Sequence, residues 1–309
     1  MKILFVNIKF KVIMSKFIPQ GVITAIVTPF KSNLDIDFDA FERLIEFQIE
    51  RKVDGIVVCG STGESATLSH KERIALIIKA IQVSKGRVPI IAGTGTNDTK
   101  ATIELSTLAK SEGADALLLV APYYNKPTQL GLLQHFLAIS ENLDIPQIIY
   151  NVPGRTGVNI SSETQIEIAK QCKNVIATKE ASGNLEQVMN IIKSAPDNFA
   201  LLSGDDALTL PMMSVGAKGI VSVLSNFAPS ELKEMVQYAL VGDFNQARKI
   251  HYDLLDLMHL NFIESNPVPV KAALGLMGLI EPFVRLPLVP IAQNNFDKIS
   301  NAMKLLKLI

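Results

Sequence analysis

The chain has 309 residues, of which 48% are hydrophobic, so it can bury a large core as two ordinary domains or as one α/β barrel with an addition. Thirty basic and thirty acidic residues cancel, and no Lys/Arg run of the kind that binds nucleic acid occurs, so small-molecule chemistry is the better expectation. Cys59 and Cys172 are the only cysteines and lie in apolar sequence, which argues against a disulfide framework and favours packing roles in a reducing cytoplasm.

Residues 1–20 begin with an apolar run that resembles the start of a signal peptide. Asn7, Lys9 and Lys11 interrupt that run and no small-x-small cleavage site follows, so we interpret the segment as an untargeted N-terminal extension, for which disorder stays open, with Met14 as an alternative start. No run of 18 apolar residues occurs, so we expect no membrane span and a cytoplasmic protein.

From residue 21 onward, short β-rich runs alternate with amphipathic segments. The eight strands predicted from this pattern are residues 21–30, 55–59, 88–92, 116–120, 147–150, 175–179, 199–203 and 219–223. The predicted helices are residues 37–52, 69–84, 97–113, 128–142, 161–172, 185–194, 207–215, 229–240, 244–260, 268–279 and 294–309. The pattern predicts a (β/α)8 TIM barrel at residues 21–240, with an open doubly wound sheet as the alternative. Residues 241–309 predict a C-terminal helical region packed on the barrel, because no Gly/Ser linker precedes them.

Polar residues collect where four of the predicted strands end. The clusters are residues 60–65, 122–125 and 150–157, together with Lys179. In a parallel barrel these positions open onto one mouth, the end at which barrel enzymes keep their active sites. The sequence therefore predicts a site at this end.

Lys179 is the centre of the predicted site. Strand alternation turns its side chain into the barrel, with Thr178 and Glu180 toward the helices and Tyr150 within reach on the neighbouring strand. An amine must lose its proton before it attacks a carbonyl, and desolvation inside a barrel lowers the pKa of a lysine. The phenol of Tyr150 both donates and accepts, so it can shuttle protons. We predict Schiff-base catalysis, although a lysine taken alone is more often an exposed charge.

Two loops offer sites for carboxylates. Ser61 and Thr62 lie between two glycines, so backbone N–H groups and hydroxyls can approach a small carboxylate, with a capped turn as the equal alternative. Arg155 follows Pro153 and Gly154 and suits a bidentate grip on a second carboxylate, although a lone arginine more often forms a surface salt bridge.

Other motifs give weaker signals. The GTG at residues 93–95 lacks the third glycine of a dinucleotide fingerprint, and no Walker-type loop occurs. The four histidines are scattered over predicted helices, so we expect no metal centre. Asp205 and Asp206 either cap a helix or bind a cation, and the cap is favoured.

Six segments of the chain carry a family resemblance. They are residues 60–65 (GSTGES), 122–127 (PYYNKP), 150–157 (YNVPGRTG), 179–184 (KEASGN), 202–206 (LSGDD) and 266–271 (NPVPVK). Together they are highly specific, and they resemble the pyruvate-dependent class I aldolases and lyases, and within these the dihydrodipicolinate synthase family. The similarity runs from about residue 21 to near the C-terminus.

This resemblance implies that Lys179 forms an imine with pyruvate, without a further cofactor, while the Ser61–Thr62 loop holds the pyruvate carboxylate. The enamine then attacks L-aspartate 4-semialdehyde, a step of lysine and diaminopimelate synthesis. By the same resemblance Tyr150, Ser61 and Tyr124 form a proton relay, in which Tyr124 comes from a neighbouring subunit of a homotetramer built as a dimer of dimers.

The resemblance also implies that Arg155 holds the carboxylate of the semialdehyde, that Gly204 belongs to the substrate site and that the backbone at Val221 orients the lysine. Two other readings stay open. One is a lyase of the same fold that cleaves N-acetylneuraminate or a 2-keto-3-deoxy sugar acid. The other is a catalytically idle sensor of small acids.

Relatives that are inhibited by lysine use a pocket whose matching positions here are Ser65, Ala66, His70, Asn97 and Tyr123. Where those relatives carry a glutamate and a further histidine, this chain has Ala101 and Arg73. The loss of a carboxylate and the gain of a cation predict weak or absent lysine inhibition. Ser61 stands where threonine is common in the family and keeps the hydroxyl, so activity should persist.

Overall fold

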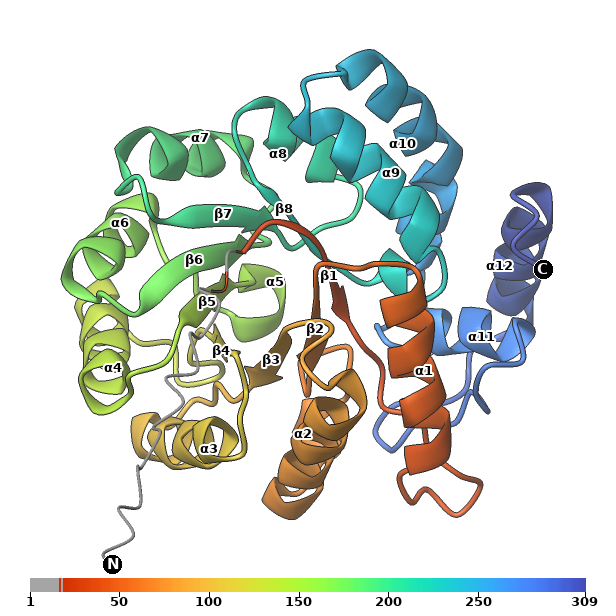
Figure 1. The fold of residues 1–309 in the computed structure, drawn as a ribbon, viewed down its shortest axis with the longest axis horizontal. Helices are drawn as coiled ribbons and strands as arrows, with labels where there is room; N and C mark the ends of the chain where they lie inside the picture. Colours follow the sequence, from red (N-terminus) through yellow and green to blue (C-terminus); the bar gives the residue numbers. More distant parts are fainter. Residues whose placement is uncertain (1–16, 18) are drawn as a thin grey trace, which may run out of the picture.

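The computed structural model describes residue 17 and residues 19–309, so nearly all of the extension predicted at residues 1–20 lies outside the described residues. Eight parallel strands form a closed barrel in sequence order, with β1 hydrogen-bonded to both β2 and β8 (Figure 1). This closure confirms the predicted barrel and excludes the open doubly wound sheet. The strands are β1 (Gly21–Ala25), β2 (Gly55–Val58), β3 (Ile90–Gly93), β4 (Ala116–Val120), β5 (Gln147–Asn151), β6 (Val175–Glu180), β7 (Ala200–Ser203) and β8 (Gly219–Ser222).

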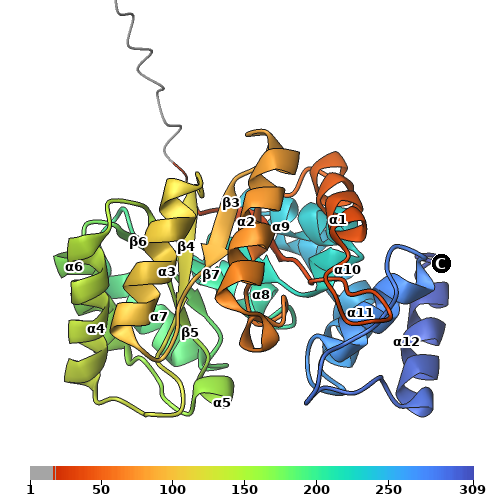
Figure 2. The ribbon, with the colours of Figure 1, turned by 90° about the horizontal axis from the view of Figure 1, so that it is seen from below.

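Helices surround this barrel and extend it at the C-terminus (Figures 1 and 2). They are α1 (Phe38–Glu50), α2 (His70–Ser84), α3 (Thr99–Ser111), α4 (Gln129–Asn142), α5 (Pro153–Thr156), α6 (Ser162–Gln171), α7 (Leu185–Ser194), α8 (Thr209–Ser214), α9 (Pro229–Leu240), α10 (Phe244–Leu260), α11 (Val268–Leu276) and α12 (Gln293–Leu305), with short 3-10 helices η1 (Ser65–Thr67) and η2 (Leu224–Asn226). Both views place α11 and α12 beside α1, at one edge of the barrel.

Side chains at the helix starts explain why the chain turns helical where it does. Asp37 accepts a hydrogen bond from the backbone N–H of Ala40, and Asp98 caps α3 in the same way. Ser69 and Glu72 form a capping box at the start of α2. These caps satisfy backbone donors that the first turn of a helix leaves free, so they fix the points at which the helices begin.

Strand alternation divides the core into two parts. Ile23, Val57 and Ile148 point into the barrel and fill its interior. Val22 and Ile56, their neighbours along the strands, point outward and pack against the helices. Because the interior is filled, polar chemistry is confined to the strand ends.

Some predicted boundaries were wrong. β1 ends at Ala25 rather than at residue 30, because the backbone N–H of Val27 donates to the side-chain oxygen of Asn226 instead of to a neighbouring strand. α11 and α12 end before residues 279 and 309, since Gly278 and Lys307 adopt a left-handed backbone, with φ of 70° and 56°, that does not continue a helix. The one-turn α5 was not predicted.

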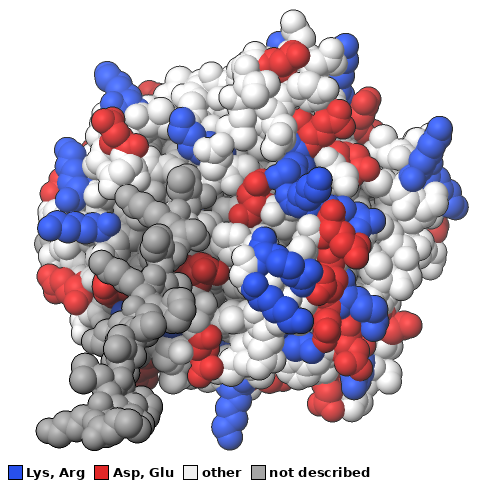
Figure 3. All heavy atoms as spheres, viewed as in Figure 1, with Lys and Arg blue, Asp and Glu red and all other residues white. Residues whose placement is uncertain are grey.

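Charges of both signs intermingle on the face in Figure 3. Pairs such as Lys79–Glu42 and Arg87–Glu46 link α1 to α2 and to the turn that follows it. None of the helices in the described part of the chain is long and apolar enough to cross a membrane.

Candidate active site

Lys179 lies next to the last residue of β6 and is 5% exposed. Tyr150 on β5 and Leu202 on β7 are its register partners, and its Nζ lies 4.2 Å from the centroid of the Tyr150 ring. A Cβ on Gly204 would come within 3.0 Å of Lys179 Cε, so glycine there leaves room for the lysine. The inward direction of Lys179 and its closeness to Tyr150 are as predicted.

Burial gives Lys179 an amine that loses its proton near neutral pH. Desolvation lowers the pKa of Lys179 to about 7, while the Asp206 carboxylate opposes this shift and the Arg155 guanidinium adds to it. An unperturbed lysine is only about one part in a thousand neutral near pH 7.4, whereas an amine with this pKa is mostly neutral there. The site therefore presents a nucleophilic amine.

Tyr150 keeps its proton at the same pH. Burial raises the pKa of the Tyr150 phenol, while the charge of Arg155 and a hydrogen bond with the Ser61 hydroxyl act in the opposite direction. A protonated phenol over an amine can donate a proton to a carbonyl oxygen and take it back. The Tyr150 ring thus covers the Lys179 amine, and its phenol interacts with the Ser61 hydroxyl.

The loop after β2 is tightly folded. The N–H of Gly63 donates to the carbonyl of Gly60 at 3.0 Å, and the N–H of Glu64 donates to the carbonyl of Ser61 at 3.1 Å. The hydroxyl of Thr28, from the loop after β1, donates to the carbonyl of Gly63 at 2.7 Å. These contacts keep the hydroxyl-bearing part of the loop in one conformation.

Ser61 and Arg155 line the same pocket, whose volume is about 330 Å³, large enough for small substrates. Arg155 belongs to α5, and its Nη2 donates to the carbonyl of Asn266 at 3.4 Å. Thr62 is buried beside Ser61, and its hydroxyl accepts a hydrogen bond from Asn266 Nδ2 at 2.9 Å. Ser61 and Arg155, one residue from each predicted carboxylate site, therefore line one cavity, whereas Thr62 and Lys179 lie outside its lining.

Two other predicted positions lie differently. Tyr124 has a φ of 75° and is 88% exposed, so its phenol points to solvent and does not pack against Lys179 of its own chain. Because the Tyr124 phenol faces solvent, a direct role of Tyr124 in catalysis requires another subunit.

Val221 lies on β8, pairs with Ile23 and is buried in the barrel interior.

The positions matched to an effector pocket are only partly together. Ser65, Ala66 and Tyr123 line the same pocket as Arg155. His70 starts α2, and the carbonyl of Asn97 accepts a hydrogen bond from Asn125. Arg73 is buried, lines the pocket and donates from Nε to the carbonyl of Ser65 at 3.1 Å, while Ala101 lies in the first turn of α3.

Asp205 and Asp206 have different environments. Asp205 accepts hydrogen bonds from the N–H groups of Ala207 and Leu208 in the turn before α8. The predicted helix cap was wrong, because α8 begins after Leu208 without a side-chain cap. Asp206 is buried and accepts from the N–H groups of Val223 and Leu224, after β8, at 3.0 and 3.2 Å. Burial raises the pKa of Asp206 to about 6, so it is largely ionised at neutral pH. The sequence did not predict the effect of the Asp206 charge on Lys179, because the order of residues does not show that Asp205 and Asp206 point in different directions.

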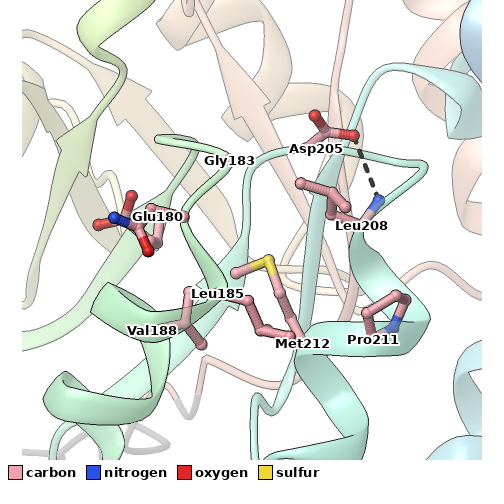
Figure 4. Close-up of a pocket in the computed structure, with 9 residues that line it drawn as sticks. Glu180, Gly183, Leu185, Val188, Asp205, Leu208, Pro211 and Met212 are labelled. Atoms are coloured by element: carbon pink, nitrogen blue, oxygen red, sulfur yellow. Dashed lines mark hydrogen bonds between the residues drawn. The ribbon is translucent and has the colours of Figure 1, made fainter.

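Glu180 points away from the barrel interior, as alternation predicted. Its carboxylate accepts hydrogen bonds from the side-chain amides of Asn151, Gln165 and Gln187. Figure 4 shows Glu180 at the edge of a small apolar pocket between α7 and α8, where the Asp205 carboxylate bonds to Leu208. That pocket holds about 30 Å³, the space of one or two water molecules, and is too small for an organic substrate.

No group of three or more His, Cys, Asp or Glu side chains suited to a metal ion occurs among residues 17 and 19–309. A closed (β/α)8 barrel with a buried, readily deprotonated lysine at its strand ends defines a lysine-dependent aldolase or lyase. The chain belongs to the dihydrodipicolinate synthetase family, whose sequence model matches residues 18–306.

Individual relatives agree with this assignment and confirm the resemblance drawn from the six segments. A 4-hydroxy-tetrahydrodipicolinate synthase from Hydrogenobaculum sp. is 52% identical over 94% of this chain and 99% of its own length. The crystal structure of dihydrodipicolinate synthase from Aquifex aeolicus is 47% identical, with a TM-score of 0.92 over 94% of this chain and 98% of that one. A chloride-inhibited dihydrodipicolinate synthase from Acinetobacter baumannii, crystallised with pyruvate, is 44% identical, with a TM-score of 0.92 over 94% of this chain and 99% of that one.

Proposed function

We propose that this protein condenses pyruvate with L-aspartate 4-semialdehyde to form 4-hydroxy-tetrahydrodipicolinate, a step of lysine and diaminopimelate biosynthesis. The observation that carries the proposal is the buried Lys179 amine, whose pKa of about 7 leaves it nucleophilic beneath the Tyr150 ring. The activity named for full-length relatives at about half identity supports the same reaction.

The reaction follows from the chemistry of the amine. Neutral Lys179 attacks C2 of pyruvate, and the carbinolamine loses water to give a protonated imine. Loss of a C3 proton forms the enamine, whose C3 attacks the aldehyde carbon of the semialdehyde. The amino group of the semialdehyde then displaces Lys179 from C2, which closes the ring and restores the free amine. Overall one water is released, and no metal or organic cofactor takes part.

The neighbouring groups divide the remaining tasks. Ser61 and Thr62 bind the pyruvate carboxylate, and Arg155 binds the carboxylate of the semialdehyde, where each charged hydrogen bond contributes roughly 1.5–3 kcal/mol. Tyr150 passes protons to and from the carbinolamine through Ser61. Gly204 and the backbone at Val221 shape the space around the lysine.

We further propose that the enzyme works in the cytoplasm as a homotetramer, built as a dimer of dimers in which Tyr124 completes the proton relay of a neighbouring subunit. The solvent-facing phenol of Tyr124 supports this assignment. In the same scheme residues 21–240 are the catalytic barrel and residues 241–309 a helical region packed on it.

Another pyruvate lyase activity is the main competitor. Arg155 on the pocket wall suits a short aldehyde that carries a carboxylate better than the polyol chain of N-acetylneuraminate or of a 2-keto-3-deoxy sugar acid. Purified protein should turn over pyruvate with L-aspartate 4-semialdehyde and show at most a trace of lyase activity on the sugar acids. The opposite preference would overturn the proposal, and binding without turnover would favour an idle sensor.

A further inference from the structure

The segment of residues 266–271 meets the loop after β2 at two points. Asn266 bonds to Thr62, and Lys271 forms a buried ion pair with Glu64. These contacts join positions more than 200 residues apart in sequence. None of the roles proposed above uses the segment, although it is one of the six that carry the family resemblance.

The first contact sets the direction of a hydroxyl. A threonine hydroxyl has one proton to donate and two lone pairs that accept. Because Asn266 Nδ2 donates to Thr62 Oγ1, one lone pair is occupied and the proton of Thr62 must find an acceptor elsewhere. Both residues are buried, so bulk water does not compete for that proton. A substrate carboxylate in the adjoining cavity is the natural acceptor.

The second contact holds the backbone of the loop. Glu64 adopts a left-handed φ of 53°, which is unfavourable for a residue with a side chain and persists where surrounding contacts enforce it. Its carboxylate pairs with Lys271 and accepts the N–H of Arg285 at 3.2 Å. The C-terminal region thus supplies both groups that anchor the side chain of Glu64.

Lys271 itself is held in place. It is 0% exposed, its Nζ donates to the carbonyl of Phe283 at 2.8 Å, and it lies 4.1 Å from the centroid of the Phe30 ring. Replacing a buried ion pair by apolar residues is often neutral or stabilising, so stability alone is a weak reason for this pair. A stronger reason is that the pair holds Glu64, which belongs to the loop that carries Ser61 and Thr62.

We propose that residues 266–271 are a positioning element for the carboxylate of the 2-oxo acid: Asn266 directs the Thr62 hydroxyl toward it, and the Glu64–Lys271 pair fixes the loop that presents this hydroxyl. The inference deepens the proposed function and rests on it. The C-terminal helices then contribute to substrate recognition as well as to packing.

The first test measures the pyruvate concentration that gives half-maximal trapping of the imine by borohydride, read by mass spectrometry. Asn266→Ala removes the directing donor and should raise this concentration about tenfold, the effect of weakening one charged hydrogen bond. Asn266→Asp should raise it further, because its carboxylate takes the Thr62 proton. Asn174→Ala removes a side-chain amide contact with the carbonyl of Ser140, before β6 and outside the pocket that Ser61 lines, and should leave this concentration unchanged.

The second test separates positioning from folding. Glu64→Gln should raise the pyruvate concentration for half-maximal trapping severalfold, because the loop loses its anchor. It should also lower Tm, because Lys271 stays buried without a carboxylate partner. Adding Lys271→Met removes the unpaired charge and should restore Tm but not pyruvate affinity. Recovery of both together would mean that the pair is merely structural and would overturn that part of the inference.

The outcomes for the inference and for the proposed function are distinct. If the unmodified protein traps no pyruvate, the proposed function fails and the inference falls with it. If the unmodified protein traps pyruvate and both folded Asn266 variants trap it with unchanged half-saturation, the inference alone is overturned.

Discussion

Two lysines, Lys179 and Lys271, are buried in the part of the chain that the structure describes, and they differ in whether the amine has a bonded partner. Each Nζ lies about 4 Å from an aromatic ring centroid, Tyr150 for Lys179 and Phe30 for Lys271. Lys271 pairs with Glu64 and donates to a backbone carbonyl. Lys179 forms no hydrogen bond or ion pair from its Nζ within the described part of the chain.

The difference shows how a barrel makes one lysine reactive and another structural. Burial lowers the pKa of both, to about 7 for Lys179 and about 8 for Lys271. Asp206 opposes the shift of Lys179 through its charge alone, whereas Glu64 opposes that of Lys271 as an ion-pair partner. An amine without a contacting partner is free to attack a carbonyl, whereas a paired ammonium keeps its proton and its place.

Of the substitutions considered, replacing Lys179 should reduce turnover the most. Lys179→Met keeps the bulk but cannot condense, so turnover should fall by about a thousandfold or more. Loss of only a few-fold in a steady-state assay would contradict the assigned role.

The same variant should be more stable than the unmodified protein. The folded pKa of Lys179 lies below its unfolded value of 10.5, so between about pH 7 and 10.5 the unfolded state binds more protons and stability rises with pH. Near pH 7.5 this amine costs up to about 4 kcal/mol, which Lys179→Met removes. Urea denaturation of both proteins measures the gain, and a loss of stability would contradict it.

Lys271→Met should have the opposite effect on stability. It leaves the Glu64 carboxylate buried without its ion-pair partner, so the free energy of unfolding should fall by about 3–5 kcal/mol. The same denaturation experiment tests this. Equal responses of the two lysine variants would erase the distinction between the two regions.

Tyr150→Phe probes the ring that covers Lys179. The ring and its packing remain while the proton carrier is lost, so kcat should fall about a hundredfold and borohydride trapping at long incubation should persist. A variant with normal kcat would remove Tyr150 from the proton relay.

Asp206→Asn should change the pH dependence more than the maximal rate. The Asp206 carboxylate raises the pKa of Lys179, so its removal lowers that pKa further. Because the protonated amine is inactive, the acid limb of the kcat/KM profile should move to lower pH. A limb that moves to higher pH, or stays in place, would show that Asp206 does not act on Lys179.

The smallest expected effect is that of added L-lysine on the reaction rate. L-Lysine should inhibit weakly or not at all, because Arg73 adds positive charge to the wall of the pocket that Ser65 and Tyr123 line, and Ala101 offers no carboxylate. Steady-state assays should give an inhibition constant above a millimolar. Tighter inhibition would mean that other groups bind the effector.

Much of this arrangement follows from the sequence. Short β-rich runs give all eight strands, and period-3.6 patterns give the helices other than α5. Alternation gives the inward direction of Lys179 and the outward direction of Glu180. The rest depends on contacts between distant residues. The pairing of Glu64 with Lys271 and the approach of Asp206 to Lys179 are set by barrel closure and C-terminal packing, which no local pattern encodes.

The most direct test of the account is borohydride reduction of the protein with pyruvate, followed by peptide mass mapping. The account predicts one reduced adduct of the three-carbon acid, on the peptide that contains Lys179, with none on the peptide that contains Lys271. No adduct, or an adduct on another lysine, would contradict the claim that the unpaired buried amine of β6 carries the chemistry.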